Sequence, residues 1–342
     1  MKLLTIVVPI YNVEPYLERC LRSLQAQDIP KDNYEIICIN DGSTDNSQEI
    51  VKRLQYEFQN IILIEQYNQG VSSARNTGID KSNGQYLLFV DPDDFIQENC
   101  LAQILKTVVL YSVEIAICGY VYLDSYGKIE GTRTYDLYEG KVMQGIDMYF
   151  LTHQKGQNQA DSSVGIIYEK DFLNKNNLRF LPNVPYLEDG EFVARVHCLA
   201  NRCIFIQETL YINIKRIDSA TRSNLFSTEK ARTGFQLAAV NLKLFQNRQY
   251  LTTRQNKLLN NSIAQFVFLA ILSALKTKSI NNLRAIFKSL KESGLEKLNL
   301  KHCSGYYRIC GKSYNVSPYL GIIMFAFYLR FENWYQSYLF KK

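Results

Sequence analysis

Short apolar runs alternate with helix-type patterns through the first hundred residues of the chain. The apolar runs are four to seven residues long and end at polar turns, whereas the segments between them repeat apolar residues every three or four positions. Strands are predicted over Leu3–Pro9, Glu35–Asn40, Ile61–Glu65 and Tyr86–Val90, with helices over about Val13–Gln27, Asn46–Phe58 and Val71–Ser82. This alternation predicts an α/β fold with a mostly parallel, doubly wound sheet.

The pattern changes in the second part of the chain. Ile115–Leu123 predicts another strand, the stretch up to about residue 215 is less regular, and the pattern beyond residue 227 is helical. Two apolar runs stand out in this helical part, Ile263–Leu275 and Val316–Leu329. Both are shorter than the roughly 20 residues that cross a bilayer, so neither is expected to span a membrane.

Charge separates the same two parts. The chain has 342 residues, of which 46% are hydrophobic, enough for one large domain and a smaller appendage. Residues 1–227 hold 21 Lys and Arg against 29 Asp and Glu, whereas residues 228–342 hold 18 against 4. The basic part is expected to contact an anionic partner, and the lack of a nucleic-acid-binding signature favours a membrane surface over nucleic acid.

The N-terminal segment and the cysteines bear on the compartment. The apolar run at the N-terminus is interrupted by Pro9 and lacks a cleavage site of small residues, so it is not expected to be a signal peptide. The eight cysteines show neither paired nor repeated spacing. A reducing, cytoplasmic environment is therefore expected. With its basic C-terminal part, the protein is expected to lie peripherally on the inner face of the plasma membrane.

Acidic residues follow the predicted strands. In parallel sheets ligands bind at the carboxyl ends of strands, which is where Asp41, Asp91 and Asp93 lie. Asp91, Asp93 and Asp94 fall within four residues and repel one another unless a cation neutralises them. Such oxygen ligands suit Mg²⁺ or Mn²⁺ bridging a diphosphate, although an acidic helix N-terminus is an alternative interpretation.

Other candidate residues are ambiguous by themselves. Asp41 is consistent with a helix cap and turn or with a contact to a base or ribose. Arg75 could contact phosphate, orient a carboxylate or lie on the surface. Glu188 and Asp189 could supply a general base or belong to a solvated acidic surface, and the spacing alone does not choose between them.

Four motifs occur in order and resemble those of the family 2 inverting glycosyltransferases, which have the GT-A fold. The motifs are Val8–Asn12, Asn40–Asp45, Gly70–Gly78 and Asp91–Asp94, and Glu188-Asp189 with Phe192 resembles a further family site. The resemblance is strong over residues 1–100 and weaker to residue 227, and residues 228–342 have no counterpart. It implies a GT-A domain over 1–227, with a nucleotide-binding half (1–100) and an acceptor half (101–227), followed by a helical C-terminal region.

The resemblance also implies individual roles. Donor binding would involve Pro9, Ile10, Tyr11, Asn12, Asp41, Arg75, Asp91 and Pro92. Within this set Tyr11 would stack on the nucleobase, Asp41 would accept from a base N–H and Asp91 would contact the ribose. Asp93 would bind the metal, Asp189 would deprotonate the acceptor hydroxyl, and Asp94 and Glu188 are secondary candidates. Asn40 and Pro92 depart from the commoner Asp and Ser of relatives, and Asn40 leaves the identity of the nucleotide less certain.

The expected activity is inverting transfer of a sugar from a nucleotide-sugar, most commonly a UDP-sugar, in bacterial surface polysaccharide synthesis. The acceptor would be a glycan or a polyprenyl-diphosphate-linked oligosaccharide. A nucleotidyltransferase is an alternative, but it would need a Gly-rich, basic loop after the first strand, where this chain has Val-Pro-Ile-Tyr-Asn. A degenerate nucleotide-sugar-binding protein is a second alternative, against which the intact acidic residues argue.

Overall fold

The computed structural model describes residues 2–135, 138, 140–153, 162–215 and 228–327. The chain forms two compact units. The first unit comprises residues 1–183 and 195–219, and the second comprises residues 184–194 and 220–342. The second unit therefore includes the segment that carries Glu188 and Asp189, whereas the other predicted site residues belong to the first unit.

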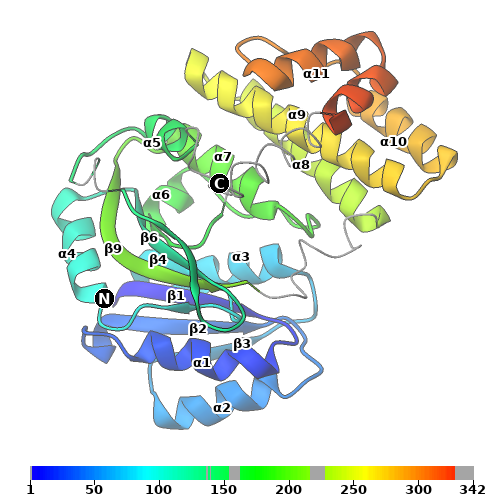
Figure 1. The fold of residues 1–342 in the computed structure, drawn as a ribbon. Coiled ribbons are helices and arrows are strands. Elements are labelled where there is room, and N and C mark those ends of the chain that lie inside the picture. Colours follow the sequence, from blue (N-terminus) through cyan, green and yellow to red (C-terminus); the bar gives the residue numbers. More distant parts are fainter. Residues whose placement is uncertain (1, 136–137, 139, 154–161, 216–227, 328–342) are drawn as a thin grey trace. The chain divides into compact units, whose positions relative to one another are not determined.

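One sheet organises the first unit (Figure 1). Nine strands of the described chain belong to it, in the order β3-β2-β1-β4-β8-β6-β9-β5, with β7 paired to β6. The β3-β2-β1-β4 half is parallel, and the rest is mixed because β8 runs antiparallel to both β4 and β6. The strands are β1 Lys2–Ile10, β2 Tyr34–Asn40, β3 Ile61–Glu65, β4 Gly84–Phe89, β5 Phe95–Ile96, β6 Ile115–Leu123, β7 Ile129–Arg133, β8 Ile166–Glu169 and β9 Cys203–Ile214.

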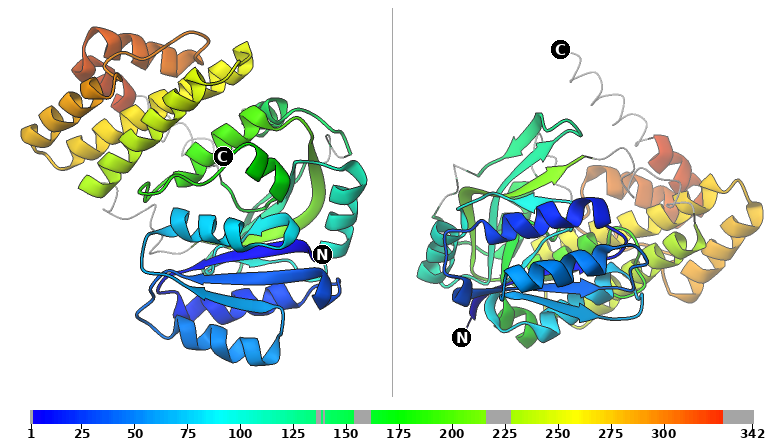
Figure 2. Two further views of the ribbon diagram at one scale, coloured as in Figure 1. Left: turned by 180° about the vertical axis from the view of Figure 1, so that it is seen from behind. Right: turned by 90° about the horizontal axis from the view of Figure 1, so that it is seen from below.

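Helices cover both faces of the parallel half of the sheet. Figures 1 and 2 show α1 and α2 on one face and α3 on the other. Gly78 allows α3 to lie close to the sheet, because a Cβ atom there would come within 2.2 Å of Val7 Cγ1. The helices outside the C-terminal part are α1 Glu14–Gln25, α2 Ser47–Glu57, α3 Val71–Lys81, α4 Leu101–Tyr111, α5 Gly145–Thr152, α6 Lys170–Lys175 and α7 Glu188–Leu199, with a 3-10 turn at Lys31–Asn33.

The alternating pattern of the first hundred residues is confirmed, with element ends within two residues of those predicted. β2 is buried along its whole length, as expected for a strand covered on both faces. The sequence did not indicate β9, a twelve-residue strand that pairs in parallel with β6. Its polar residues interrupt the apolar pattern, and two of them contact the loop that follows β4.

The second unit is a helical bundle built around one long helix. Its helices are α8 Glu229–Asn247, α9 Thr253–Lys276, α10 Ile280–Glu292 and α11 Gly305–Val316, followed by a short apolar helix, Pro318–Phe327. α9 packs against α8, α10 and α11. Phe268 of α9 stacks on Phe325 with ring centroids 4.7 Å apart. The central position of α9 explains why its residues are mostly apolar.

The length of α9 differs from the sequence estimate. The 13-residue apolar run Ile263–Leu275 lies inside a helix of 24 residues. The helix begins earlier because Thr252 and Gln255 form a reciprocal cap, and because Leu258 and Leu259 of its first half are buried. By length and composition α9 could cross a bilayer, but 72% of its most apolar window is buried within the protein, as in a core helix.

Candidate active site

The loops after β1 and β2 are locked together by Asn12. Its N–H donates to Ser43 Oγ at 3.2 Å, and its Oδ1 accepts from the N–H of Thr44 at 2.8 Å. Asn12 has a φ of 52°, a left-handed conformation that asparagine tolerates better than most residues. Pro9 and Ile10 lie in β1 with Ile10 fully buried, whereas the Tyr11 side chain is half exposed. Tyr11 is therefore accessible to a flat ligand beside a rigid loop.

The starts of α1 and α2 cap each other through two carboxylates. Asp45 accepts from the N–H groups of Glu14 and Ser47, both at 3.0 Å, while Glu14 accepts from the N–H of Asn46 at 3.0 Å. Partial burial raises the pKa of Asp45, but hydrogen bonds from Ser47 and Glu14 outweigh it, so the pKa lies below its usual range. No feature of the sequence pattern indicated that the two helix starts share these acids.

Asp41 shapes the loop that leads into α3. Its Oδ1 accepts from Gln66 Nε2 at 2.7 Å and from the N–H of Gln69 at 2.9 Å, and its Oδ2 accepts from the N–H of Gly70 at 2.8 Å. Gly70 has a φ of 86°, which favours glycine. The carboxylate is almost fully buried. The predicted contact with a base N–H would have to use the remaining lone pair of Oδ2.

Arg75 and Asp91 form the central ion pair of the site. Arg75 Nη2 lies 2.9 Å from Asp91 Oδ1, and the Arg75 side chain is only 3% exposed against 31% for Asp91. The guanidinium also lies over the Phe180 ring at 5.1 Å. A buried arginine needs a partner to offset its lost hydration. Among the possibilities left open by the sequence, Arg75 orients a carboxylate.

Asp94 points into the protein and is bound by β9. Tyr211 Oη donates to it at 2.9 Å, Asn213 Nδ2 at 3.0 Å and the N–H of Ile214 at 3.1 Å. Burial, assisted by the charge of Asp91, raises the pKa of Asp94 to about 7 despite these hydrogen bonds. Tyr211 also accepts from the N–H of Asp91 at 3.1 Å, so one hydroxyl ties both ends of the acidic turn to β9. This burial disfavours Asp94 as a secondary metal ligand.

The side chain of Asp93 is partly exposed at the same turn. Pro92 is buried and stiffens the turn, in which the N–H of Asp94 donates to the carbonyl of Asp91 at 3.0 Å. Arg19 of α1 donates to the carbonyl of Asp93 at 2.9 Å and so holds the turn from outside. The expected repulsion among the three acids is thus relieved in part by the guanidinium of Arg75 and by the raised pKa of Asp94.

The donor set limits which metal fits. Within the described parts of the chain, no group of three or more His, Cys, Asp or Glu side chains could hold a metal ion by themselves. Asp93, with Asp91 beside it, offers hard carboxylate oxygens at a partly exposed position. Such a position fits Mg²⁺ or Mn²⁺, which bind through one or two carboxylates and take their other ligands from phosphate and water.

The predicted general base lies in the second unit. Glu188 and Asp189 form the first turn of α7, and both are partly buried. Glu191, two residues further along the same helix, is fully buried and accepts a hydrogen bond from Asn241 Nδ2 of α8 at 2.7 Å. Glu191 thus fastens α7 to α8, which the acidic cluster in the sequence did not indicate. The role of Asp189 stays a prediction.

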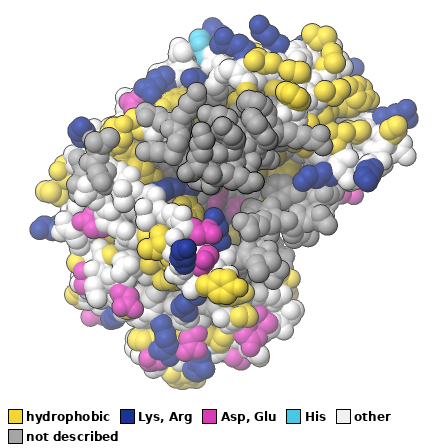
Figure 3. Space-filling view, in the orientation of Figure 1, with side chains coloured by type: hydrophobic (Ala, Val, Ile, Leu, Met, Phe, Trp, Pro, Cys, Tyr) yellow, Lys and Arg dark blue, Asp and Glu magenta, His cyan; other side chains and the backbone are white. Residues whose placement is uncertain are grey.

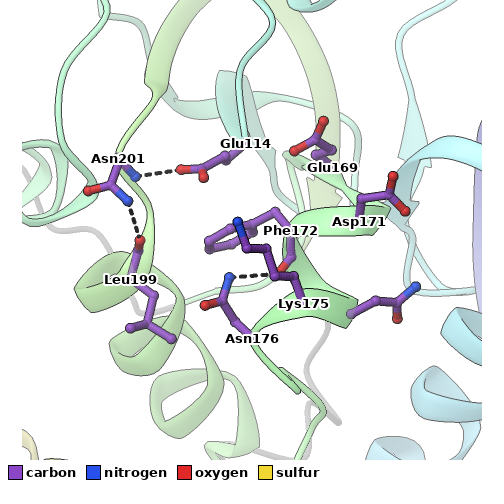
Figure 4. Close-up of a pocket in the computed structure, with 9 residues that line it drawn as sticks. Glu114, Glu169, Asp171, Phe172, Lys175, Asn176, Leu199 and Asn201 are labelled. Atoms are coloured by element: carbon purple, nitrogen blue, oxygen red, sulfur yellow. Dashed lines mark hydrogen bonds between the residues drawn. The ribbon is translucent and has the colours of Figure 1, made fainter.

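A cavity of about 440 Å³ in the first unit is not this site. Figure 4 shows it lined by Glu114, Glu169, Asp171 and Lys175, among others. Glu114 precedes β6, which runs in the same direction as β4 because both pair antiparallel with β8. The cavity therefore lies at the amino end of these strands, whereas Asp91 follows the carboxyl end of β4. Ligands of parallel sheets bind at the carboxyl end.

Comparison with known proteins finds a matching family model and several relatives. The family model described as Glycosyl transferase family 2 matches residues 5–168. Glycosyltransferase GlyA of Streptococcus pneumoniae is 34% identical over 227 residues, which are 64% of this chain and 31% of that protein. The chain thus spans about a third of that relative's length.

Solved structures resemble a larger part of the chain. A crystal structure of S. aureus TarS residues 1–349 in complex with UDP-GlcNAc has a TM-score of 0.59 at 20% identity, over 85% of this chain and 92% of that one. The mannosyltransferase PcManGT from Pyrobaculum calidifontis, in complex with GDP-Man and Mn²⁺, has a TM-score of 0.52 at 14% identity, over 94% and 86%. At such identities the likeness concerns the fold.

Proposed function

The chain belongs to the family 2 glycosyltransferases, with a GT-A fold and a helical extension, and we propose that it transfers a sugar from a UDP-sugar to a glycan hydroxyl with inversion. The acceptor we propose is a growing surface glycan or a polyprenyl-diphosphate-linked oligosaccharide. Support for a polymeric acceptor comes from relatives whose names refer to teichoic acid biosynthesis or to poly(ribitol-phosphate), such as a poly(ribitol-phosphate) beta-glucosyltransferase that is 41% identical over 100 residues.

The observation that carries the proposal is the construction of the acidic turn. Asp91 is fixed by the buried Arg75, and Asp94 is fixed by β9, while the intervening Asp93 is left at a partly exposed position. A turn that served only to cap a helix would not need a buried arginine and three donors from a distant strand. This arrangement supports a site that presents one carboxylate to a diphosphate-bound cation.

The donor's nucleoside would bind at the loops after β1 and β2. Tyr11 offers an exposed ring for stacking on the base, and Asp41 Oδ2 keeps acceptor capacity for a base N–H. Asp91 Oδ2 would accept from a ribose hydroxyl while Oδ1 stays paired with Arg75. The UDP-GlcNAc complex of TarS supports uracil as the base.

Asp93 would hold a divalent cation, Mn²⁺ or Mg²⁺, with Asp91 as its neighbour. When bound, such a cation neutralises charge that develops on the leaving diphosphate. Asp189 would accept the proton of the acceptor hydroxyl as that oxygen attacks the anomeric carbon. Because one displacement occurs on the face opposite the leaving group, an α-linked donor would give a β-linked product.

The test combines binding with product analysis. The full chain is screened by thermal shift against UDP, UDP-GlcNAc, UDP-glucose and GDP-mannose, with and without Mn²⁺, because a ligand that binds the native state raises its stability. Release of UDP and a glycosylated acceptor supports the proposal. A parallel reaction with UTP and a sugar 1-phosphate tests the alternative, because release of pyrophosphate there would indicate a nucleotidyltransferase. Binding without donor hydrolysis or transfer would indicate a degenerate binding protein.

A further inference from the structure

The helix Pro318–Phe327 is apolar on two sides. Gly321, Ile322 and Phe325 are buried, and a Cβ atom at Gly321 would come within 2.5 Å of Tyr314 Cβ, so this side packs tightly on the bundle. The other side is left in solvent. Its residues are between 38% and 69% exposed and recur at helical spacing, namely Tyr319, Leu320, Ile323, Met324 and Phe327. A helix that is apolar all round is normally buried. The exposed stripe therefore indicates a surface that contacts another apolar phase or molecule.

Neighbouring helices carry further exposed apolar residues. Ile309 and Val316 of α11 are exposed, and Lys312 lies between them on the same helix face. Phe287 of α10 contacts Tyr319 edge to face with ring centroids 5.0 Å apart. α10 therefore borders the stripe directly, and we call the exposed apolar residues of Pro318–Phe327 with Ile309 and Val316 the apolar patch.

Exposed cations surround the apolar patch. Arg284, Lys288 and Lys291 recur at helical spacing on α10, and Arg308 and Lys312 lie on α11; all five are exposed. Exposed acids in the described part of the second unit are Glu229, Glu292 and Glu296. Figure 3 shows hydrophobic side chains gathered over the α10–α11 end of this unit, with Lys and Arg side chains at its margin. An apolar strip with a cationic rim matches the depth profile of an anionic bilayer surface.

We propose that the apolar patch inserts into the headgroup region of an anionic membrane while the cations of α10 and α11 contact lipid phosphates. A second copy of the chain would bring two cationic rims together, which like-charge repulsion opposes. A soluble polyanion would neutralise the rim but leave the apolar patch in water. The lipid surface is the occupant that satisfies both features. This inference is independent of the proposed sugar transfer.

The experiment measures binding of the full chain to vesicles. Wild-type protein is titrated with vesicles of phosphatidylcholine alone and with about a third phosphatidylglycerol at low salt. We expect at least tenfold tighter partition onto the anionic vesicles and a loss of this preference as salt is added. Ile323→Asp with Phe327→Asp should weaken anionic binding at least tenfold. Arg284→Glu with Lys288→Glu and Lys291→Glu should remove the preference for anionic lipid.

Matched controls come from the first unit. Leu110→Asp is an exposed apolar position on α4, and Lys52→Glu with Lys81→Glu and Lys106→Glu removes the same amount of charge; both should bind vesicles like wild type. All variants are checked for unchanged Tm, and Phe327→Ser replaces the double variant if the latter unfolds. Equal partition of wild type onto both vesicle types would overturn the proposal. So would wild-type vesicle binding by the patch variants, or a dimer that the patch variants dissociate.

Discussion

The strand-end loops of the first unit and the helix α10 of the second unit differ in how their charged side chains are placed. At the strand-end loops of the first unit, Arg75, Asp91 and Asp94 have specific partners at 2.9–3.1 Å, and Arg75 and Asp94 are buried. On α10 of the second unit the cations are exposed, and the ion pair of Lys288 with Glu292 spans 3.8 Å with both side chains mostly in solvent. Buried charges lose hydration and require partners, whereas exposed charges are screened and require none.

The difference predicts how each unit responds to mutation. In the first unit each polar contact has a defined geometry, so a single substitution should have a large and local effect. In the second unit the exposed cations of α10 would act together through their combined positive charge. A single substitution among them should therefore change the unfolding free energy little.

Asp93→Ala should abolish measurable transfer, a loss of at least about 10³-fold, because electrostatic stabilisation of the leaving group is commonly the largest catalytic contribution. The side chain is partly exposed, so Tm should change little. Activity with a soluble acceptor and UDP binding with and without Mn²⁺ are measured. Retained Mn²⁺-dependent UDP binding would show that the cation is held elsewhere.

Asp189→Asn should lower the transfer rate by at least about 10²-fold, the lower range for losing a positioned base. Affinity for the donor should be nearly unchanged because the residue is proposed to act on the acceptor. The matched control is Glu188→Gln at the neighbouring position of the same helix turn. If Glu188→Gln is inactive and Asp189→Asn transfers normally, the base is the preceding residue.

Two buried tyrosines provide a direct comparison of the units. Tyr211 links Asp94 with the N–H of Asp91, and Tyr314 of α11 donates to the carbonyl of Leu295 at 2.9 Å. Removing either hydroxyl leaves buried polar groups unpaired, at a cost of about 1–3 kcal/mol in unfolding free energy. Tyr211→Phe should also weaken UDP binding, whereas Tyr314→Phe should not. Equal effects on UDP affinity would mean that Tyr211 acts only through global stability.

The sequence predicted the strand-end loops well because their signals are local. Asp41 and Asp91 follow apolar strands directly, and the adjacent glycines and prolines mark the turns. The partners of Asp94 were not predictable in this way, because Asn213 lies 119 positions further along the chain and its contact depends on the pairing of β9 with β6. The attachment of Glu191 to Asn241 was missed for the same reason.

Lys288→Ala should have the smallest effect on stability and so sharpens the contrast most. Its ion pair with Glu292 is long and exposed, and such pairs couple by less than about 0.5 kcal/mol. A double-mutant cycle with Glu292→Ala, measured by urea unfolding, gives this coupling directly. Coupling above about 1 kcal/mol, the upper end for exposed ion pairs, would mean that α10 holds matched pairs and the contrast fails. Vesicle binding should respond more strongly, since each basic residue contributes about 1 kcal/mol at an anionic surface, or about fivefold in partition. If Lys288→Ala weakens vesicle binding but leaves the unfolding free energy unchanged, the charge of Lys288 serves membrane binding and not folding stability.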